Sequence, residues 1–293
     1  KDAGGGEPAP ILFICSDAHR YDYALGERGQ QLMPRLQELG RQGVVYRRAY
    51  SDASWTLPSV VSLLTGRPPR FHGTGRRIET GAIEQLRQQP LAPGQFFLDW
   101  GEDSAVLTAY PRQLITLGER LQEQGYTTAM VLSNPLYLLS GLYADGQDVV
   151  IDTTVVPGEE VNRSAFALLE RLAGQQPLFL LVHYMDTHHF TQWYFEPAHP
   201  GKTPREAKEE WIAAYEQAVR ETDRNLGELL DRWDAHVGLD RSLVVFFADH
   251  GEHLLDPGRE ARGHGNSMDE ILLHVPLVVK FPRGVQRAPG EVD

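Results

Sequence analysis

The feature that most constrains the fold is an apolar run, residues 243–248, which ends abruptly in Asp249, His250 and Gly251. A run this short, rich in β-branched and aromatic residues, predicts a strand that is buried on both faces. In open α/β sheets, ligands bind beyond the carboxyl ends of such strands. Asp249 and His250 would then lie at a strand tip, and both are metal-ligating residue types. The alternative is that Asp249 caps a following helix and His250 lies on the surface.

Three other apolar runs are followed by residues of the kinds that bind metals, anions or protons. Residues 11–15 are followed by Asp17 and Arg20, residues 126–132 by Asn134, and residues 178–182 by Asp186, His188 and His189. If the strands are parallel, their tips share one edge of the sheet. We therefore expect Asp17, Asp186 and Asp249 to converge.

The segments between these runs have the spacing of amphipathic helices. Helices are predicted at 32–39, 114–125, 161–172 and 204–233, and further strands at 44–50, 149–156 and 275–281. Strands that alternate with helices predict an α/β fold with a mainly parallel, mixed central sheet, helices on both faces, and all strand tips pointing one way. Residues 73–110 have no clear periodicity, and we interpret them as an insertion or a substrate-side flap.

A hydroxyl residue stands at the start of one more predicted helix. Thr56 precedes Pro58, which suits the first turn of a helix that would end at Gly66. A hydroxyl at that place faces unpaired backbone N–H groups and the positive end of the helix dipole, and both favour an alkoxide or a bound anion. The simpler interpretation is a Thr56 that only caps the helix.

The net charge of −12 argues against a general nucleic-acid binder, which needs a basic face. An anionic substrate would need local positive charge from a metal or an arginine; Arg20 could supply it, or could simply pair with Asp22. No apolar run approaches the length of a membrane span. Residues 1–10 are predicted to be a linker and residues 11–293 a single domain. A periplasmic, extracytoplasmic or membrane-anchored full-length form is compatible with this sequence, which indicates no compartment.

Six short motifs follow one another in order along the chain. They are residues 17–22, 56–59 with 64–66, 125–129, 183–186, 249–252 and 275–277. Together they resemble the sulfatase branch of the alkaline phosphatase superfamily, over nearly the whole chain outside 73–110. The resemblance implies an alkaline phosphatase-like three-layer sandwich. Chains of this family normally continue into a smaller C-terminal region, which residues 11–293 are expected to lack.

The resemblance also implies a metal site and a nucleophile. A divalent ion would be held by Asp17, Asp249 and His250, and the nucleophile would be Thr56, which would itself contact the metal. We add Asp186 as a candidate metal ligand, and we expect one or two ions per chain. Zinc or manganese suits such a mixed carboxylate and imidazole site better than calcium or magnesium.

Further residues are expected to contact the substrate. His188 and His264 fall where relatives place histidines that bind substrate, protonate the leaving group or hold a second metal. His189 is a neighbouring alternative to His188 and a candidate substrate-binding residue. Arg20 and Asn134 are the other candidate substrate-binding residues.

The departures from the family pattern bear on the chemistry. Sulfatases of this branch use formylglycine, made from Cys or Ser with an Arg four positions on, whereas this chain has Thr56 and Val60. Oxidation of the Thr56 secondary alcohol gives a ketone, so it cannot become that aldehyde. Ala18 stands where the family often has a second Asp. A metal-bound Thr is instead similar to the nucleophile of the phosphodiesterases, phosphoethanolamine transferases and lipoteichoic-acid synthases of the superfamily.

The leading hypothesis is therefore a metal-dependent hydrolase or phosphotransferase that acts on phosphoesters through Thr56. One alternative is a sulfuric ester hydrolase that works without formylglycine. Another, from a different class, is a non-catalytic domain that binds a metal or an anion. The substrate would be a small-molecule, lipid-linked or glycan-linked phosphate or sulfate ester.

Overall fold

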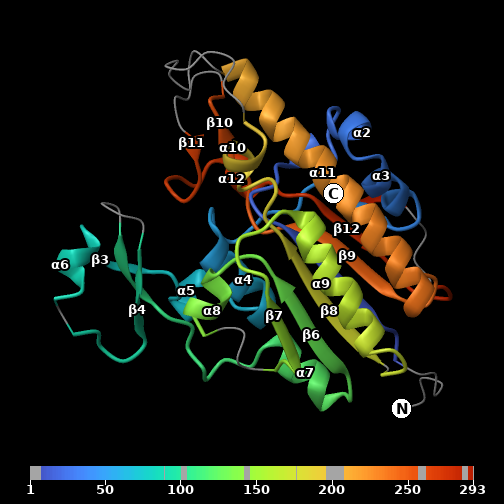
Figure 1. Cartoon of the computed structure of the whole chain (residues 1–293), viewed down its shortest axis with the longest axis horizontal. Coiled ribbons are helices and arrows are strands. Elements are labelled where there is room, and N and C mark those ends of the chain that lie inside the picture. Colours follow the sequence, from blue (N-terminus) through green and yellow to red (C-terminus); the bar gives the residue numbers. More distant parts are fainter. Residues whose placement is uncertain are drawn as a thin grey trace.

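The computed structural model describes residues 8–88, 90–99, 104–141, 146–175, 177–195, 208–256, 262–285 and 290–292. Residues 1–7 of the predicted linker and residues 204–207 of the predicted long helix lie outside the described residues. Figure 1 shows a central sheet covered by helices, with a smaller lobe to one side. This arrangement confirms the predicted α/β class.

The centre of the fold is a mixed sheet of eight described strands, in the order β13-β2-β12-β9-β1-β8-β6-β7. The strands are β1 Ile11–Ser16, β2 Val44–Tyr46, β6 Thr127–Leu132, β7 Val149–Asp152, β8 Leu178–Tyr184, β9 Leu243–Ala248, β12 Leu277–Lys280 and β13 Gly290–Val292. All of them run in the same direction except β12, which is antiparallel to both β9 and β2.

The expectation that every strand tip points the same way is therefore wrong for β12. The chain leaves β9 at one edge, forms the small hairpin of β10 (His253–Leu254) and β11 (Arg262–Gly263), and returns into the sheet from that same edge. A parallel strand would have needed a crossover connection to the opposite edge. The second predicted strand, 44–50, is also shorter than expected, because β2 ends at Tyr46.

Helices cover both faces of the sheet. They are α1 Tyr21–Ala24, α2 Gly29–Leu32, α3 Pro34–Arg41, α4 Thr56–Thr65, α5 Pro69–His72, α6 Ile83–Leu86, α7 Leu117–Glu123, α8 Leu136–Leu139, α9 Gly158–Arg171, α10 Phe190–Trp193, α11 Lys208–His236 and α12 Glu270–Leu273. Within the described residues, no helix combines the length and the apolar character that crossing a membrane requires.

The inner strands are buried on both faces because their alternate side chains enter two different cores. Leu12 and Ile14 of β1 pack into a core shared with α3, α9 and α11. Phe13, between them, packs against a second core that contains buried residues of α4 and α8. The long helix α11 presents Tyr215 and Trp233 to the first core, and both side chains are fully buried.

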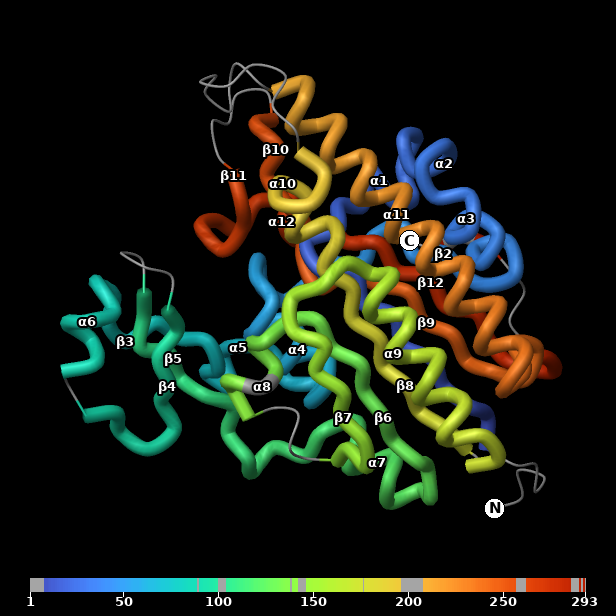
Figure 2. Tube along the Cα trace, in the orientation of Figure 1, coloured from blue at the N-terminus to red at the C-terminus, as the bar shows by residue number. Residues whose placement is uncertain are grey.

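Residues 73–110 form most of the smaller lobe. Its strands β3 (Arg77–Thr80), β5 (Ala105–Thr108) and β4 (Gln95–Leu98) make an antiparallel sheet in that order. Figure 2 shows the chain leaving the body after α5 and returning towards α7. Phe96 and Leu107 of the lobe join the core of α4, so the lobe packs on the helix that begins with Thr56.

Candidate active site and metal centre

Polar residues at the carboxyl ends of four parallel strands gather at one edge of the sheet. Asp17 follows β1, Asn134 lies two residues after β6, His183 is the penultimate residue of β8, and Asp249 follows β9. Adjacent parallel strands that pair in register end at the same level, and β1 pairs in this way with both β8 and β9. The structure therefore brings Asp17 and Asp249 together, as the strand pattern predicts.

Asp17 is the hub of this cluster. Its Oδ2 accepts hydrogen bonds from Thr56 Oγ1 at 3.2 Å and from Asn134 Nδ2 at 2.8 Å, and lies 3.4 Å from His183 Nε2. Its Oδ1 lies 3.4 Å from His250 Nε2. That His250 nitrogen is also 3.3 Å from Thr56 Oγ1. Five segments distant in sequence thus meet around one buried carboxylate.

Thr56 is the first residue of α4, and the helix cap is Trp55, which makes no side-chain capping bond. The Thr56 side chain is 1% exposed and turns towards Asp17 rather than back to the helix. It is thus not the simple capping residue of the alternative interpretation. Ser59, one turn later, donates from Oγ to the Asp249 backbone oxygen at 2.6 Å and ties α4 to the tip of β9.

The turn after β1 is held in an uncommon backbone conformation. Ala18 has a φ of +54°, in the left-handed region that is unfavourable for a residue with a Cβ atom. Its N–H donates to Asp249 Oδ1 at 3.2 Å, and its carbonyl accepts from the Tyr215 hydroxyl at 2.8 Å. Strained residues of this kind persist where the surroundings fix them. Here the conformation of Ala18 places its N–H against the Asp249 carboxylate, beside Asp17.

Burial and neighbouring charge shift the ionisation of this cluster. Burial opposes ionisation of Asp17, but His188, His183 and His250 hold its pKa well below the usual value. Burial and the charge of Asp17 raise the pKa of Asp249. Burial disfavours the charged form of His250 too, yet the nearby Asp249 and Asp17 raise its pKa to about 9. The cluster thus favours positive charge between its two carboxylates.

The cluster fits a divalent metal ion. Asp17, His183 and Asp249 each offer one ligand atom, and these atoms all lie within 4.8 Å of one another. Asp17 Oδ1, Asp249 Oδ2 and both ring nitrogens of His183 are buried without a hydrogen-bond partner. Buried polar atoms are rarely left unpaired, so this set has the chemistry of an ion site. His250 Nε2, 3.5 Å from Asp249 Oδ2, lies beside it.

A group of histidines lies next to this centre. The ring of His264 is 4.3 Å from that of His250 and 4.9 Å from that of His188. His264 Nδ1 lies 2.9 Å from Glu252 Oε2. An ionised carboxylate only accepts, so Nδ1 donates and Nε2 is left for a substrate. Burial lowers the pKa of His188 to about 3. His189 stacks on Trp193 at 5.1 Å, at the outer side of the group.

Asp186 does not join the cluster. Its carboxylate accepts from Gly158 N at 3.0 Å and from the Tyr194 hydroxyl at 2.6 Å. It therefore fixes the first turn of α9, where a carboxylate is favoured by the helix dipole. The chain turns away from the sheet after β8, so a residue two positions past the strand end faces the helix layer and not the edge.

Arg20 also lies outside the centre. The sequence allowed two interpretations of this residue, an anion contact or a pair with Asp22, and the structure shows the second. Its guanidinium pairs with Asp22 and Asp256, each at 2.8 Å. Both acceptors are carboxylates, so its charge is already matched. The Arg20 guanidinium is therefore occupied by these two carboxylates and does not face the centre to bind an anion.

Two residues of the site were not predicted. The sequence places His183 in the motif 183–186 and Glu252 in the motif 249–252, and predicts no individual role for either residue. The signal for His183 was its position near the end of a fully apolar strand, because a polar residue there must face either a core or the site. Glu252 could have been found only from the fold, because its partner His264 is 12 residues away.

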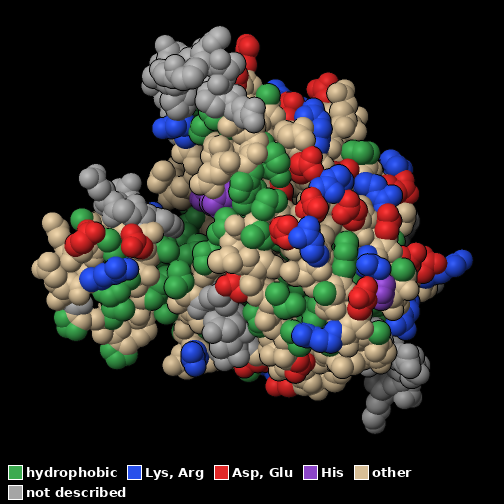
Figure 3. All heavy atoms as spheres, in the orientation of Figure 1, with side chains coloured by type: hydrophobic (Ala, Val, Ile, Leu, Met, Phe, Trp, Pro, Cys, Tyr) green, Lys and Arg blue, Asp and Glu red, His purple; other side chains and the backbone are tan. Residues whose placement is uncertain are grey.

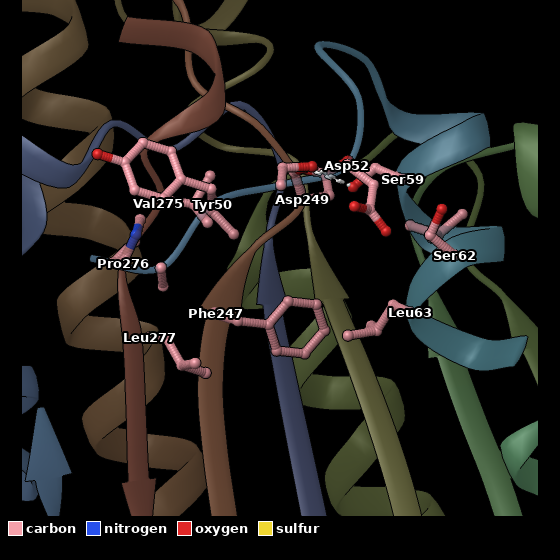
Figure 4. Close-up of a pocket in the computed structure, with 14 residues that line it drawn as sticks. Tyr50, Asp52, Ser59, Ser62, Leu63, Phe247, Asp249, Val275, Pro276 and Leu277 are labelled. Atoms are coloured by element: carbon pink, nitrogen blue, oxygen red, sulfur yellow. Dashed lines mark hydrogen bonds between the residues drawn. The ribbon is translucent and has the colours of Figure 1, made fainter. Parts of the chain in front are cut away.

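A small cavity reaches the centre from the side of β9 and β12. Its volume is about 200 Å³, and it is lined by Phe247, Leu277, Leu63 and Ser59 among others, with Asp249 at its inner end. Figure 4 shows Asp249 and Ser59 side by side at the top of this cavity and Phe247 with Leu63 below them.

The sequence and the fold were compared with known proteins. The sulfatase family model matches residues 10–292. The chain is 28% identical to an ulvan-active sulfatase from Formosa agariphila over 96% of its own length and 57% of that protein. It therefore spans a little over half of that curated relative.

Solved structures show the same fold at low identity. A 2-O GAG sulfatase superposes with a TM-score of 0.70 at 14% identity, over 98% of this chain and 66% of the other. A phosphonate monoester hydrolase from Silicibacter pomeroyi superposes with a TM-score of 0.68 at 16% identity, over 97% and 71%. The family match across almost every residue leads to one conclusion: the chain belongs to the sulfatase family.

Proposed function

We propose that this chain carries the catalytic centre of a metal-dependent hydrolase or phosphotransferase that acts on phosphoric esters through Thr56. The observation that carries the proposal is the place of the Thr56 hydroxyl, which is buried at the start of α4 and within 3.3 Å of Asp17 and His250. A threonine cannot supply the aldehyde of formylglycine, but its oxygen can attack phosphorus directly.

Asp17, Asp249 and His183 would hold the ion, with His250 as a fourth candidate ligand. When bound, a divalent ion lowers the pKa of a nearby hydroxyl and polarises a phosphoryl oxygen. Zinc or manganese suits these ligands better than calcium or magnesium.

The residues of the chain would perform the remaining steps. Thr56 Oγ1 attacks phosphorus, a Thr56 oxygen–phosphorus bond forms, and the bond to the leaving oxygen breaks. Asp17 Oδ2 accepts the Thr56 hydrogen bond and orients the hydroxyl. Because the pKa of Asp17 is held well below its usual value, the Thr56 proton would pass to water rather than to this carboxylate. His264, oriented by Glu252, gives a proton to the leaving oxygen. Water, or an acceptor alcohol, then displaces Thr56 from phosphorus and regenerates the hydroxyl.

A sulfuric ester is the second candidate substrate. It is supported by the names of the relatives, which include an ulvan-active sulfatase and a GAG sulfatase. The phosphonate monoester hydrolase among the neighbours supports the phosphorus reading instead. Both candidates use the same cluster, and they differ in the ester that Thr56 must attack.

The test compares p-nitrophenyl phosphate, bis-p-nitrophenyl phosphate and p-nitrophenyl sulfate, with and without added zinc or manganese. We expect turnover of a phosphate ester, its loss in Thr56→Ala, and a phosphate on Thr56 detected by mass spectrometry after a rapid quench. Thr65→Ala is the matched control, because Thr65 lies in the same helix and its hydroxyl bonds only within α4 and its end. Turnover of the sulfate alone would refute the phosphoryl proposal, and inactivity on every ester with metal bound would favour a binding domain.

A further inference from the structure

The β10–β11 hairpin carries both residues of the proposed proton donor. Glu252 directly precedes β10, His264 directly follows β11, and Glu252 Oε2 lies 2.9 Å from His264 Nδ1. Among the described residues the two strands pair at two positions, and so short a ladder does not fix its own place in a fold. Figure 3 shows histidine side chains in the hollow between the smaller lobe and the body, below the part that Figure 1 labels β10 and β11. Whatever anchors the hairpin therefore also sets where His264 lies.

The guanidinium of Arg20 joins this hairpin to the tip of β1. Arg20 is 7% exposed and comes three residues after Asp17. Its Nη1 donates to Asp256 Oδ1 at 2.8 Å and lies 3.5 Å from the Glu252 carbonyl oxygen. Its Nε and Nη2 donate to the Asp22 carboxylate at 2.9 and 2.8 Å. The side chain of Asp256 is 16% exposed and that of Asp22 is 52% exposed, so the more buried side of the guanidinium is the one that contacts the hairpin.

Both ends of this link are held by further contacts. At one end, Arg20 N donates to the buried Tyr215 hydroxyl at 3.0 Å. At the other end, Asp256 Oδ2 accepts from the backbone N of Leu254, a residue of the core, at 3.1 Å. Leu255 lies between them with a φ of +59°, in the left-handed region that is unfavourable for a residue with a Cβ atom. Such a conformation persists where its surroundings fix it. The Asp256 carboxylate thus closes a strained turn and accepts from Arg20 at the same time.

Charge makes the contact between Arg20 and Asp256 strong. Burial opposes ionisation of Asp256, but Arg20 holds its pKa below the usual value. His253 faces the same carboxylate, with Nδ1 at 4.0 Å from Asp256 Oδ2, and its Nε2 lies 3.3 Å from Asp269 Oδ2. Arg20 is therefore the nearer cation. A charge-assisted hydrogen bond in a largely buried place is strong and directional, and loss of either partner leaves the other charge unmatched.

We propose that Arg20 and Asp256 are positioning residues for His264. They act through the β10–β11 hairpin, which they fasten to the strand tip that carries Asp17, and so set the place from which His264 protonates the leaving oxygen. This inference rests on the proposed function, because it assigns two further residues to the proton-donating step. A proton donor matters most when the leaving oxygen is strongly basic. Loss of the positioning pair should therefore depend on the leaving group, whereas a general loss of structure should not.

The test compares two esters that differ in the leaving group, p-nitrophenyl phosphate and benzyl phosphate, or their methyl diesters if the protein cleaves only diesters. Nitrophenolate leaves without a proton, whereas the benzyl alkoxide needs one. We expect Asp256→Asn to lower kcat for the benzyl ester about tenfold or more, and kcat for the p-nitrophenyl ester less than about threefold. Elemental analysis should show unchanged bound metal. Arg20→Gln should have the same effect, and the double variant should lose little more than either single variant, because the two residues act as a pair.

The matched control is Asp22→Asn, which removes a carboxylate from the same guanidinium but from an exposed position outside the hairpin. This control should change kcat for either ester by less than about threefold. Equal losses on both esters in Asp256→Asn, or the same selective loss in Asp22→Asn, would overturn the proposal.

A second measurement does not depend on turnover. Hydrogen exchange followed by mass spectrometry should be faster in peptides that contain His264 in Asp256→Asn, and unchanged in Asp22→Asn. Unchanged exchange in Asp256→Asn would refute the anchoring role of the pair. Inactivity of the unmodified protein on every ester would instead refute the proposed function, so the two failures are distinguishable.

Discussion

Replacing Tyr215 by Phe should destabilise the protein by far more than the loss of one hydroxyl suggests. The Tyr215 hydroxyl donates to the Ala18 carbonyl at 2.8 Å and accepts from Arg20 N at 3.0 Å. Both backbone groups flank the tip that carries Asp17, and all of these residues are buried. The phenylalanine ring would keep the edge-to-face contact with Tyr23, so the change removes only hydrogen bonds.

The magnitude follows from two buried groups that lose their partner. Each unsatisfied buried donor or acceptor costs about 1–3 kcal/mol, and partial relaxation should leave a total of roughly 2–4 kcal/mol. The strained Ala18, with its φ of +54°, would then be free to relax and to shift Asp17. We therefore expect a lower affinity for the bound ion as well.

The assay is urea unfolding of the metal-free protein followed by metal titration. Tyr23→Phe is the control, because the one hydrogen bond of the Tyr23 hydroxyl among the described residues is accepted from Arg28, whose side chain is 51% exposed. That variant should lose less than about 1 kcal/mol. If Tyr215→Phe proves as stable as Tyr23→Phe and binds the ion equally well, the strained tip does not depend on Tyr215 and the reasoning is refuted.

Three further predictions concern the metal ligands, the bound ion and the buried imidazole of His72. His183→Ala should lose bound metal, whereas Asp186→Asn should keep it and lose only stability at the start of α9, as measured by elemental analysis and urea unfolding. Chelation should lower the melting temperature, and zinc or manganese should restore it. Burial lowers the pKa of His72, so the folded state prefers the neutral ring. The free energy of unfolding should therefore be highest above pH about 6.5, where the ring is neutral in both states, and should decrease below that pH. His72→Gln should flatten that part of the pH profile.

Much of the site follows from the sequence because parallel strands carry their tips to one edge. Asp17 and Asp249 each follow a short apolar run. These runs form β1 and β9, which are neighbours in the sheet. Residue type and strand position were enough to place them. Pro58 places Thr56 at the start of a helix. The expectation that its hydroxyl lies near the two carboxylates came from the family resemblance.

Two features of the central sheet could not be predicted from the sequence. One is which side chains near the end of β8 face the site, and the other is the antiparallel direction of β12. His183 and Asp186 are three residues apart and both are ligand types, yet only His183 faces the edge. The difference depends on how the chain turns after β8, which no local pattern encodes. An apolar run such as β12 reads the same in either direction. Residues 73–110 are interpreted from the sequence as an insertion or a substrate-side flap, but their strands could not be predicted because β3 is exposed along its whole length and has no alternation.

The same geometry that suits catalysis makes folding and metal binding inseparable. Asp17, His183 and Asp249 come from three strands, so no part of the unfolded chain offers them together. Folding without an ion buries two carboxylates whose free oxygens have no hydrogen-bond partner, and uncompensated buried charge is costly. An ion that binds only the folded state therefore adds stability that grows with its affinity and with its free concentration. A change that spares the ligands but loosens their strands, as at Tyr215, should then weaken metal affinity and stability together.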